Sequence, residues 1–412
     1  MTKDHAFIPI AKPLLDEAEA EATKRPILSG WVTQGPEVAA FEQEFATYVG
    51  ANYACAVSSC TTALHLALLA VGVQPGDEVI TVSHSYIATA NSVRYCGAKP
   101  VFVDIEPGTF NINPDLIESA ITVHTRAILC VHQMGMPCNL AKIVDIARQH
   151  SLAVVEDAAC AIGSEILWEN QWEKIGKPHG DIACFSFHPR KVITTGDGGM
   201  LTTNNPEWDK QFRLWRQHGM SVPDTVRHGS PQVIFESYPV LGYNYRMTDI
   251  QGAIGREQLK KLPEIVQRRQ SLARQYEELL TPFSEVKLPE EPTWARSNWQ
   301  SYCIRLSNTL SQHQVMQLML DQGVATRRGI MCSHREKAYS REFWSCIAKP
   351  KTCECPPNTC KQLSESEEAQ NNGIVLPLYP QMLQSEQNRV IDTLVKILSN
   401  LSRTDLPDIP YQ

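Results

Sequence analysis

Short apolar runs alternate with helical segments between residues 50 and 205, and this alternation limits the fold of the 412-residue chain more than any other feature. The runs are mostly rich in β-branched residues and do not alternate with polar ones, which is typical of strands covered on both faces. They occupy residues 79–82, 100–105, 127–131 and 152–155. Helical segments such as 142–150 lie between them, so the pattern predicts an α/β fold with a mostly parallel sheet flanked by helices.

A smaller α+β unit is predicted from about residue 245 onward. Residues 248–280 favour a long amphipathic helix that is broken near Pro263, because proline cannot donate a helical hydrogen bond. The later elements are a strand at 302–306 and helices near 315–322 and 384–401. We therefore expect a large domain at 1–258 and a small C-terminal domain at 259–412.

The charge balance and the apolar runs exclude several classes of protein. The chain has 38 Lys and Arg against 45 Asp and Glu, a net charge of −7, and no long basic run, which argues against a nucleic-acid partner. No stretch approaches the roughly 18 apolar residues that cross a bilayer, and the N-terminus lacks a secretory signal. We expect a cytoplasmic protein with no membrane partner, whose 13 cysteines are reduced thiols.

Three segments carry side chains that suit catalysis. Asp157 follows the apolar run at 152–155, Lys191 follows the strand-like run at 181–187, and Ser58 to Thr62 precede a helix. Each also has a simpler interpretation, as a helix cap, a surface lysine or an ordinary N-cap. We expect burial and neighbouring cations to lower the pKa of the lysine and make its amine nucleophilic.

Taken together, the three segments match the needs of one cofactor. Pyridoxal phosphate (PLP) requires a lysine for its Schiff base, a carboxylate for its ring nitrogen and a helix N-terminus for its phosphate. The carboxylate keeps the ring protonated as an electron sink, and the released lysine can move the substrate's proton. The combination predicts a PLP-dependent enzyme.

The chain resembles the DegT/StrS family of fold-type I PLP-dependent sugar aminotransferases, which have the aspartate-aminotransferase-like fold. The resemblance extends from Ile8 to about Leu401, and several motifs occur in the family's order. These motifs lie at 29–36, 59–64, 76–79, 100–104, 155–159, 184–191, 196–200, 242–248 and 326–330.

The resemblance implies a role for each cofactor residue. Lys191 looks like the Schiff-base lysine and Asp157 like the partner of the ring nitrogen. Ser186, Cys60 and Thr61 fall where the family binds the cofactor's phosphate. Because the lysine is retained, the resemblance argues against the related sugar 3-dehydratases, which carry histidine at that position.

Two further positions and two departures follow from the same resemblance. Tyr86 matches the aromatic residue that stacks on the cofactor, although an aromatic residue after a strand is more often core. Asn244 resembles an asparagine that reaches the phosphate of the neighbouring subunit, which implies a homodimer with shared active sites; a turn residue is the alternative. Cys60 replaces a glycine, so a positive φ there would be strained. Cys160 replaces a glutamine or histidine that contacts the cofactor in the family.

Two groups in the C-terminal part are candidates of other kinds. Arg327, Arg328 and His334 lie in a segment that borders the substrate cleft in the family, and arginine suits a nucleotide diphosphate. Surface salt bridging is their alternative role. The segment 346–368 is expected to be an irregular loop that looks inserted relative to the family. Its four cysteines have no usual zinc spacing, so we expect no metal, with a zinc site as the alternative; they are Cys346, Cys353, Cys355 and Cys360.

The sequence therefore predicts a homodimeric PLP-dependent aminotransferase. We expect it to move an amino group from an amino acid, with glutamate as the donor, to a nucleotide-linked keto sugar for amino-sugar or surface-glycan synthesis. PLP-dependent elimination and transamination of a keto-cyclitol are alternatives within the same fold. A catalytically weak regulatory or scaffold protein is the alternative outside the enzymes.

Overall fold

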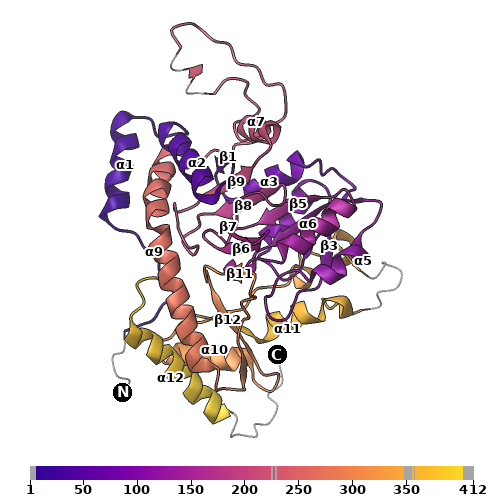
Figure 1. The fold of residues 1–412 in the computed structure, drawn as a ribbon, viewed down its shortest axis with the longest axis vertical. Helices are drawn as coiled ribbons and strands as arrows, with labels where there is room; N and C mark the ends of the chain where they lie inside the picture. Colours follow the sequence, from indigo (N-terminus) through magenta and orange to yellow (C-terminus); the bar gives the residue numbers. More distant parts are fainter. Residues whose placement is uncertain (1–5, 224–225, 228–229, 348–354, 357, 402–412) are drawn as a thin grey trace.

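A large, mostly parallel sheet forms the centre of the molecule (Figure 1). The computed structural model describes residues 6–223, 226–227, 230–347, 355–356 and 358–401. The sheet has eight strands in the order β1-β9-β8-β5-β4-β2-β3-β14, and β9 runs antiparallel to both of its neighbours. The strands are β1 (Tyr53–Val57), β2 (Glu78–Val82), β3 (Lys99–Val103), β4 (Thr125–Val131), β5 (Ala153–Asp157), β8 (Ile182–Ser186), β9 (Gly199–Thr203) and β14 (Ser345–Cys346).

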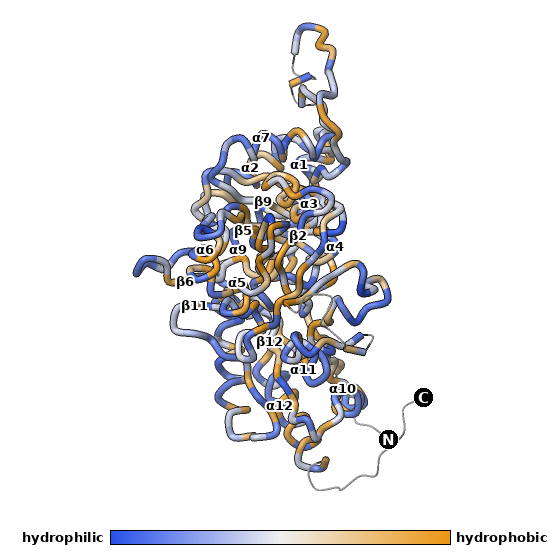
Figure 2. Tube along the Cα trace, turned by 90° about the vertical axis from the view of Figure 1, so that its right-hand side faces the viewer, coloured by the Kyte–Doolittle hydropathy of each residue, from blue (hydrophilic) through white to orange (hydrophobic). Residues whose placement is uncertain are grey.

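Helices cover both faces of this sheet, which explains why its strands are almost uniformly apolar. One face packs against α2, α6 and the first half of α9, and the other against α3, α4 and α7. The hydrophobic strands β2 and β5 lie between these layers (Figure 2). The helices are α1 (Glu17–Ser29), α2 (Pro36–Val49), α3 (Cys60–Ala70), α4 (Ala88–Tyr95), α5 (Ile117–Ala120), α6 (Leu140–Gln149), α7 (Pro206–Trp215) and α9 (Asp249–Leu280).

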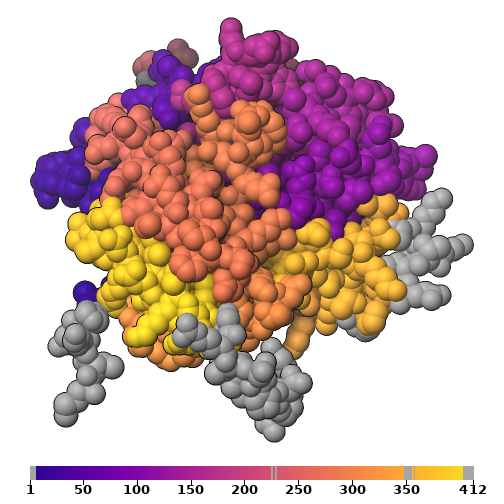
Figure 3. All heavy atoms as spheres, turned by 60° about the horizontal axis from the view of Figure 1, so that its bottom comes forward, coloured from indigo at the N-terminus to yellow at the C-terminus, as the bar shows by residue number. Residues whose placement is uncertain are grey.

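A second hydrophobic core forms around a four-stranded antiparallel sheet in the order β10-β12-β15-β13. Helix α12 packs beside the second half of α9 in this core, as the yellow and salmon surfaces of Figure 3 show. A separate three-stranded sheet joins β6, β7 and β11. The elements are β10 (Val286–Lys287), β12 (Tyr302–Leu306), β13 (Arg327–Arg328), β15 (Gly373–Leu376), α10 (Gln312–Asp321), α11 (Ser364–Asn372), α12 (Gln384–Leu401), β6 (Glu165–Trp168), β7 (Gln171–Lys174) and β11 (Ala295–Arg296).

Short 3₁₀ helices complete the described elements, at Pro114–Leu116, Gln133–Gly135, Ser333–Arg335, Arg341–Phe343 and Lys361–Leu363. The predicted fold class is confirmed: a mostly parallel α/β sheet flanked by helices, with a smaller α+β unit. Within the described residues, no helix is both long enough and apolar enough to cross a membrane.

The predicted helix break near Pro263 is wrong. Helix α9 runs without interruption from Asp249 to Leu280, with Pro263 inside it. Leu259 and Leu262 are buried in the first core and Leu272 in the second, so burial on both sides holds the helix together. The boundary that we predicted at 258–259 falls inside this helix, and the division into two domains stays a prediction.

The segment 346–368 is more regular than predicted. Cys346 belongs to β14, which pairs in parallel with β3 at the edge of the large sheet, and α11 begins at Ser364. The carboxylate of Asp104 accepts hydrogen bonds from the N–H groups of Glu365 and Ser366, which anchors the start of α11 to the end of β3. Cys353 lies outside the described residues. Within those residues, no group of three or more metal-ligating side chains is gathered.

The segment after α7 projects from the top of the molecule in Figure 1 and carries apolar side chains outward. Phe235 is 91% exposed and Leu241 is 82% exposed. Such apolar exposure is characteristic of surfaces that bind another protein. Asn244 lies at the base of this segment, where it forms an isolated β-bridge with Gln217.

Candidate active site

A cavity of about 540 Å³ opens between the large sheet and the small antiparallel sheet. It lies at the carboxyl ends of the parallel strands, where Val131 and Asp157 pair in register, as do Asp157 and Cys184. Open α/β sheets bind ligands at this edge. Nine of the predicted site residues line the cavity: Lys191, Asp157, Cys160, Ser186, Cys60, Thr61, Tyr86, Arg327 and Arg328.

Asp157 is buried at the floor of this cavity, where Thr89 and the Ala159 N–H are its two nearest donors. Its Oδ2 accepts a hydrogen bond of 2.7 Å from Thr89 Oγ1, and its Oδ1 accepts one of 3.2 Å from the Ala159 N–H. Burial raises the pKa of Asp157 above its ordinary value, although the Thr89 bond acts in the opposite direction. The carboxylate makes no ion pair shorter than 4.0 Å with a described residue. It is therefore available to a positively charged ligand atom.

A second hydroxyl group extends this arrangement. Ser85 Oγ lies 2.7 Å from Thr89 Oγ1. Because Thr89 donates its single hydroxyl proton to the carboxylate, Ser85 must be the donor in the bond between the two hydroxyls. The chain Ser85–Thr89–Asp157 thus orients one carboxylate oxygen and favours its ionised form.

Lys191 faces Asp157 from the loop after β8, and its Nζ donates a hydrogen bond of 2.9 Å to Cys160 Sγ. We expected a lowered lysine pKa, and the structure gives the opposite direction. Burial does lower the pKa of Lys191, but the nearby Cys160 and Asp157 outweigh it, so the pKa is raised. No cation is among the groups that act most strongly on the pKa of Lys191, which are Cys160, Asp157 and Cys60.

The first turn of α3 forms the third wall of the cavity. Ser59 caps the helix by accepting a bond from the Thr62 N–H. The N–H groups of Cys60 and Thr61 donate to no atom of the described residues, and Ser186 lines the cavity beside them. Free N–H groups at a helix start suit a phosphate.

The strain that we expected at Cys60 does not arise. Cys60 is the first residue of α3 and is absent from the described residues with positive φ. Its Sγ lies 3.6 Å from the carbonyl oxygen of Cys184 and 4.0 Å from Asp157 Oδ1. Burial raises the pKa of the Cys60 thiol well above its usual range, so the sulfur is protonated at neutral pH.

Cationic and aromatic side chains surround the mouth. Tyr86 is 62% exposed, which is too open for a core residue. Arg327 and Arg328 are exposed on β13, and neither forms an ion pair with a described residue. His188 and Arg190 also line the cavity. The salt-bridge alternative for the two β13 arginines therefore has no support in the described part of the chain.

His334 is not at the cavity, contrary to our expectation. Its ring is buried, with Nδ1 2.6 Å from Ser83 Oγ and Nε2 3.0 Å from Glu367 Oε1. Both ring nitrogens are thus engaged within the protein, and burial lowers the pKa of His334. His334 therefore links Ser83, which follows β2, to Glu367 in α11, and its role in the described residues is structural.

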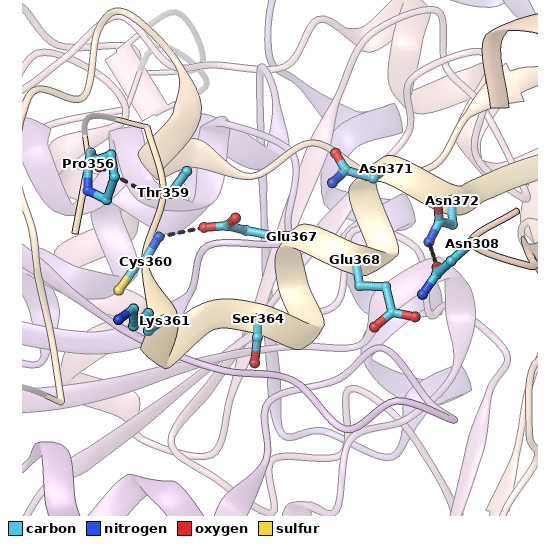
Figure 4. Close-up of a pocket in the computed structure, with 10 residues that line it drawn as sticks. All are labelled: Asn308, Pro356, Thr359, Cys360, Lys361, Ser364, Glu367, Glu368, Asn371 and Asn372. Carbon is cyan, nitrogen blue, oxygen red and sulfur yellow. Dashed lines mark hydrogen bonds between the residues drawn. The ribbon is translucent and has the colours of Figure 1, made fainter. Parts of the chain in front are cut away.

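A second hollow, of about 570 Å³, lies along α11. Figure 4 shows Glu367 at its wall, accepting a bond of 2.6 Å from the Cys360 N–H. None of the predicted catalytic or cofactor residues lines it. Its lining is polar and open, and nothing in it resembles the chemistry of the first cavity.

Asn244 does not line the cavity of its own chain and is exposed. Several residues that line the cavity were missed by sequence reasoning, including Ser85, Thr89, His132 and Gln300. Small hydroxyl residues are too common to carry a signal. One indication was available for Thr89. It lies three residues after Tyr86, in the first turn of a helix that follows a strand, which could have placed it at the cavity.

The fold and this site together define a class of protein. One cavity brings together a lysine amine, a buried carboxylate and helix N–H groups, and the last two have no ion-pair or hydrogen-bond partner, respectively, among the residues that the structure describes. Groups of these kinds suit the aldehyde, ring nitrogen and phosphate of PLP. On the doubly covered α/β sheet, this set defines a PLP-dependent enzyme of the aminotransferase class.

The comparison with known proteins identifies the family. A model described as the DegT/DnrJ/EryC1/StrS aminotransferase family matches residues 13–395, and the chain belongs to this family. It is similar to the uncharacterized protein MJ1066 of Methanocaldococcus jannaschii, with 34% identity over 397 residues that cover 96% of this chain and 98% of that protein.

Two solved structures extend the comparison. DesV of S. venezuelae is 30% identical with a TM-score of 0.83, covering 97% of this chain and 100% of DesV. Spr1654 of Streptococcus pneumoniae, solved in its PLP form, is 26% identical with a TM-score of 0.84, covering 96% of this chain and 99% of that one. The chain is a PLP-dependent aminotransferase of a sugar aminotransferase family.

Proposed function

We propose that the chain transfers an amino group from glutamate to a nucleotide-linked keto-deoxy sugar, in the cytoplasm, for amino-sugar or surface-glycan synthesis. One observation supports this substrate class above others. Arg327 and Arg328 line the cavity that also holds Lys191 and Asp157, and both arginines are exposed and without ion pairs in the described residues. Guanidinium groups bind diphosphate oxygens in a bidentate manner, so a nucleotide diphosphate suits this mouth.

The chain's own residues divide the work inside the cavity. When bound, PLP supplies the sink for the electrons that remain after a substrate carbon loses its proton. Asp157 would hold positive charge at the ring nitrogen, and the Cys60 and Thr61 N–H groups with Ser186 would bind the phosphate. Lys191 would hold the cofactor covalently, and its free amine would remove and return the proton at the substrate carbon.

A homodimer with shared active sites is part of the proposal. Asn244 lies outside the cavity of its own chain, at the base of a segment that exposes Phe235 and Leu241. A second copy of the chain would bury these apolar side chains and bring its Asn244 to the phosphate end of the cavity.

The proposal is tested first by the absorbance of the purified protein and its response to glutamate. We expect a yellow protein that glutamate bleaches as 2-oxoglutarate appears, and a Lys191→Ala variant that does neither. Candidate nucleotide keto sugars are then added, and the product is read by mass. Replacement of the ketone oxygen by an amino group supports the proposal, whereas loss of water or ammonia without amination indicates elimination and contradicts it.

A matched pair of acceptors tests the nucleotide. Replacement of both arginines in Arg327→Gln/Arg328→Gln should raise KM at least tenfold for the nucleotide-linked sugar. It should leave KM for the same sugar without a nucleotide unchanged. Equal effects on both acceptors, or amination of a keto-cyclitol alone, would contradict the assignment.

A further inference from the structure

A lysine amine and a thiol meet inside the cavity. Lys191 Nζ lies 2.9 Å from Cys160 Sγ, and both side chains line the cavity and retain some exposure. A small oxidant dissolved in water therefore reaches the sulfur. We propose that Lys191 and Cys160 form a redox modification site, at which a peroxide joins them through a reversible S–N bond.

The reaction balances with hydrogen peroxide as the oxidant. The Cys160 sulfur attacks one peroxide oxygen, the O–O bond breaks, and the released hydroxide takes the thiol proton and leaves as water. The resulting sulfenic acid is attacked by Lys191 Nζ. The S–O bond breaks, and hydroxide leaves with a proton from the nitrogen as a second water. The sulfur loses two electrons, the peroxide gains two, and the side chains lose two hydrogen atoms in total.

The surroundings of Lys191 and Cys160 favour oxidation of the sulfur first and attack by the amine second. Lys191 Nζ is a hydrogen-bond donor 2.9 Å from the sulfur that peroxide attacks. Burial lowers the pKa of Lys191, and Cys160 opposes burial and raises it. Oxidation of Cys160 to the neutral sulfenic acid weakens that opposition, so burial then favours the free amine of Lys191. The amine is thus released next to its electrophile.

Cys60 is the competing nucleophile, since it is the other thiol among the described residues that line the cavity. Its Sγ lies 3.6 Å from the Cys184 carbonyl oxygen. Burial and the neighbouring Asp157 raise the pKa of the Cys60 thiol, so very little of the nucleophilic thiolate is present. The contact with Lys191 therefore favours the S–N bond over a Cys60–Cys160 disulfide.

The consequence is a chain that oxidises differently with and without its cofactor. The cross-link depends on the contact alone, whereas its effect on cofactor uptake rests on the role proposed for Lys191. A lysine that holds PLP covalently has no free amine for the sulfenic acid. PLP should therefore prevent the cross-link, and the cross-link should prevent PLP uptake until a thiol reductant opens it.

The experiment treats the full chain, freed of PLP, with hydrogen peroxide and measures its intact mass. We expect a loss of about 2 Da, the mass of two hydrogen atoms. Trypsin should no longer cleave after Lys191, and one peptide pair should join residues 191 and 160. Dithiothreitol should restore the mass, the cleavage and the uptake of PLP as read by visible absorbance. The PLP-loaded chain should show none of these changes.

Three variants make the assignment specific. Cys160→Ser and Lys191→Arg should abolish the mass loss, and Cys60→Ser should retain it. A cross-link that disappears in Cys60→Ser would identify a disulfide and overturn the proposal. A gain of about 32 Da at Cys160 with cleavage after Lys191 intact would also overturn it, because it shows oxidation to the sulfinic acid without capture. Both readouts are independent of transamination, so they remain valid if the proposed substrate is wrong.

Discussion

Asp157 is buried at the cavity floor, where its charged carboxylate lowers the stability of the folded chain and is positioned to bind a positively charged ligand atom. Burial raises the pKa of Asp157 in the folded chain above its value in the unfolded chain. The stability linked to this group is therefore present at low pH, where the carboxyl is protonated in both states, and is lost as the pH rises through the folded-state pKa. A positively charged ligand atom offsets that loss.

Asp157→Asn should separate the two effects. In the chain freed of PLP, the variant should melt at a higher temperature than the parent at pH 7, because it removes a buried charge, and the difference should vanish near pH 3. Its affinity for PLP should fall by about 10- to 100-fold, the value of a charge-assisted hydrogen bond. Calorimetry across this pH range measures the first effect and absorbance titration the second. A variant that is less stable at pH 7 would show that Asp157 is well compensated without a ligand.

We expect Thr89 to affect PLP affinity indirectly, through its hydrogen bond to Asp157. Its hydrogen bond lowers the pKa of the carboxyl, so Thr89→Val should weaken PLP binding about tenfold, with partial recovery in Thr89→Ser. Thr81→Val is the matched control. Thr81 is equally buried, and its hydroxyl donates a bond of 2.7 Å to the Leu129 carbonyl oxygen, away from Asp157. Equal losses of PLP affinity in both variants would show a general packing effect.

The candidate catalytic and binding residues could be predicted from the sequence where a residue of that type is rare at that kind of position. A lysine or an aspartate at the end of a buried strand, or soon after it, is costly and stands out, as Lys191 and Asp157 do. Thr89 carries no such cost and was missed. His334 was placed at the substrate because its segment borders the substrate cleft in the family that the chain resembles. Its partners Ser83 and Glu367 are far away along the chain, so the local sequence does not reveal them.

At the scale of elements, β9 and the start of α3 approach each other more closely than side chains allow. A Cβ atom added at Gly199 would lie 2.4 Å from the carbonyl carbon and oxygen of Ser59 and 2.7 Å from the Cys60 nitrogen. Glycine at this point therefore sets the position of the helix N-terminus that we assign to the phosphate.

Gly199→Ala should push that N-terminus away from the cavity. We expect a loss of about 1–3 kcal/mol of stability from overpacking, and a loss of the preference for PLP over pyridoxal, which lacks the phosphate. Gly196→Ala is the control in the same loop, since a Cβ there contacts nothing, although its φ of +85° brings some strain. Competition between PLP and pyridoxal measures the preference. A Gly199→Ala variant that keeps it would place the phosphate elsewhere.

Elements were predictable where the local pattern agrees with the tertiary packing. The buried strands β2, β4 and β5 were expected from their apolar runs, because both faces are covered by helices. Pro263 was read as a break because its local cost is evident, while the two cores that hold α9 together are not visible in sequence. The start of α11 escaped prediction for a similar reason, since its cap is Asp104, about 260 residues away.

At the scale of the whole molecule, the homodimer that we propose, with its shared active sites, predicts complementation between two inactive chains. Lys191→Ala and Asn244→Ala homodimers should each be nearly inactive. After unfolding and refolding as an equal mixture, half of the dimers are hybrids, and each hybrid has one site with both residues intact. About a quarter of the parent activity should therefore return. If Asn244 acts within its own chain, mixing restores nothing.

The uninterrupted course of α9 has a consequence for how substrates enter. A hydrogen-bonded helix resists bending far more than a loop does, and α9 is embedded in both cores that wall the cavity. At Pro263 one turn lacks a backbone donor, so some give is confined to that point. We therefore expect the distance between the two walls of the cavity to stay nearly constant. Substrates should then enter past the exposed side chains of Tyr86 and the β13 arginines, which line the cavity, without bending of α9.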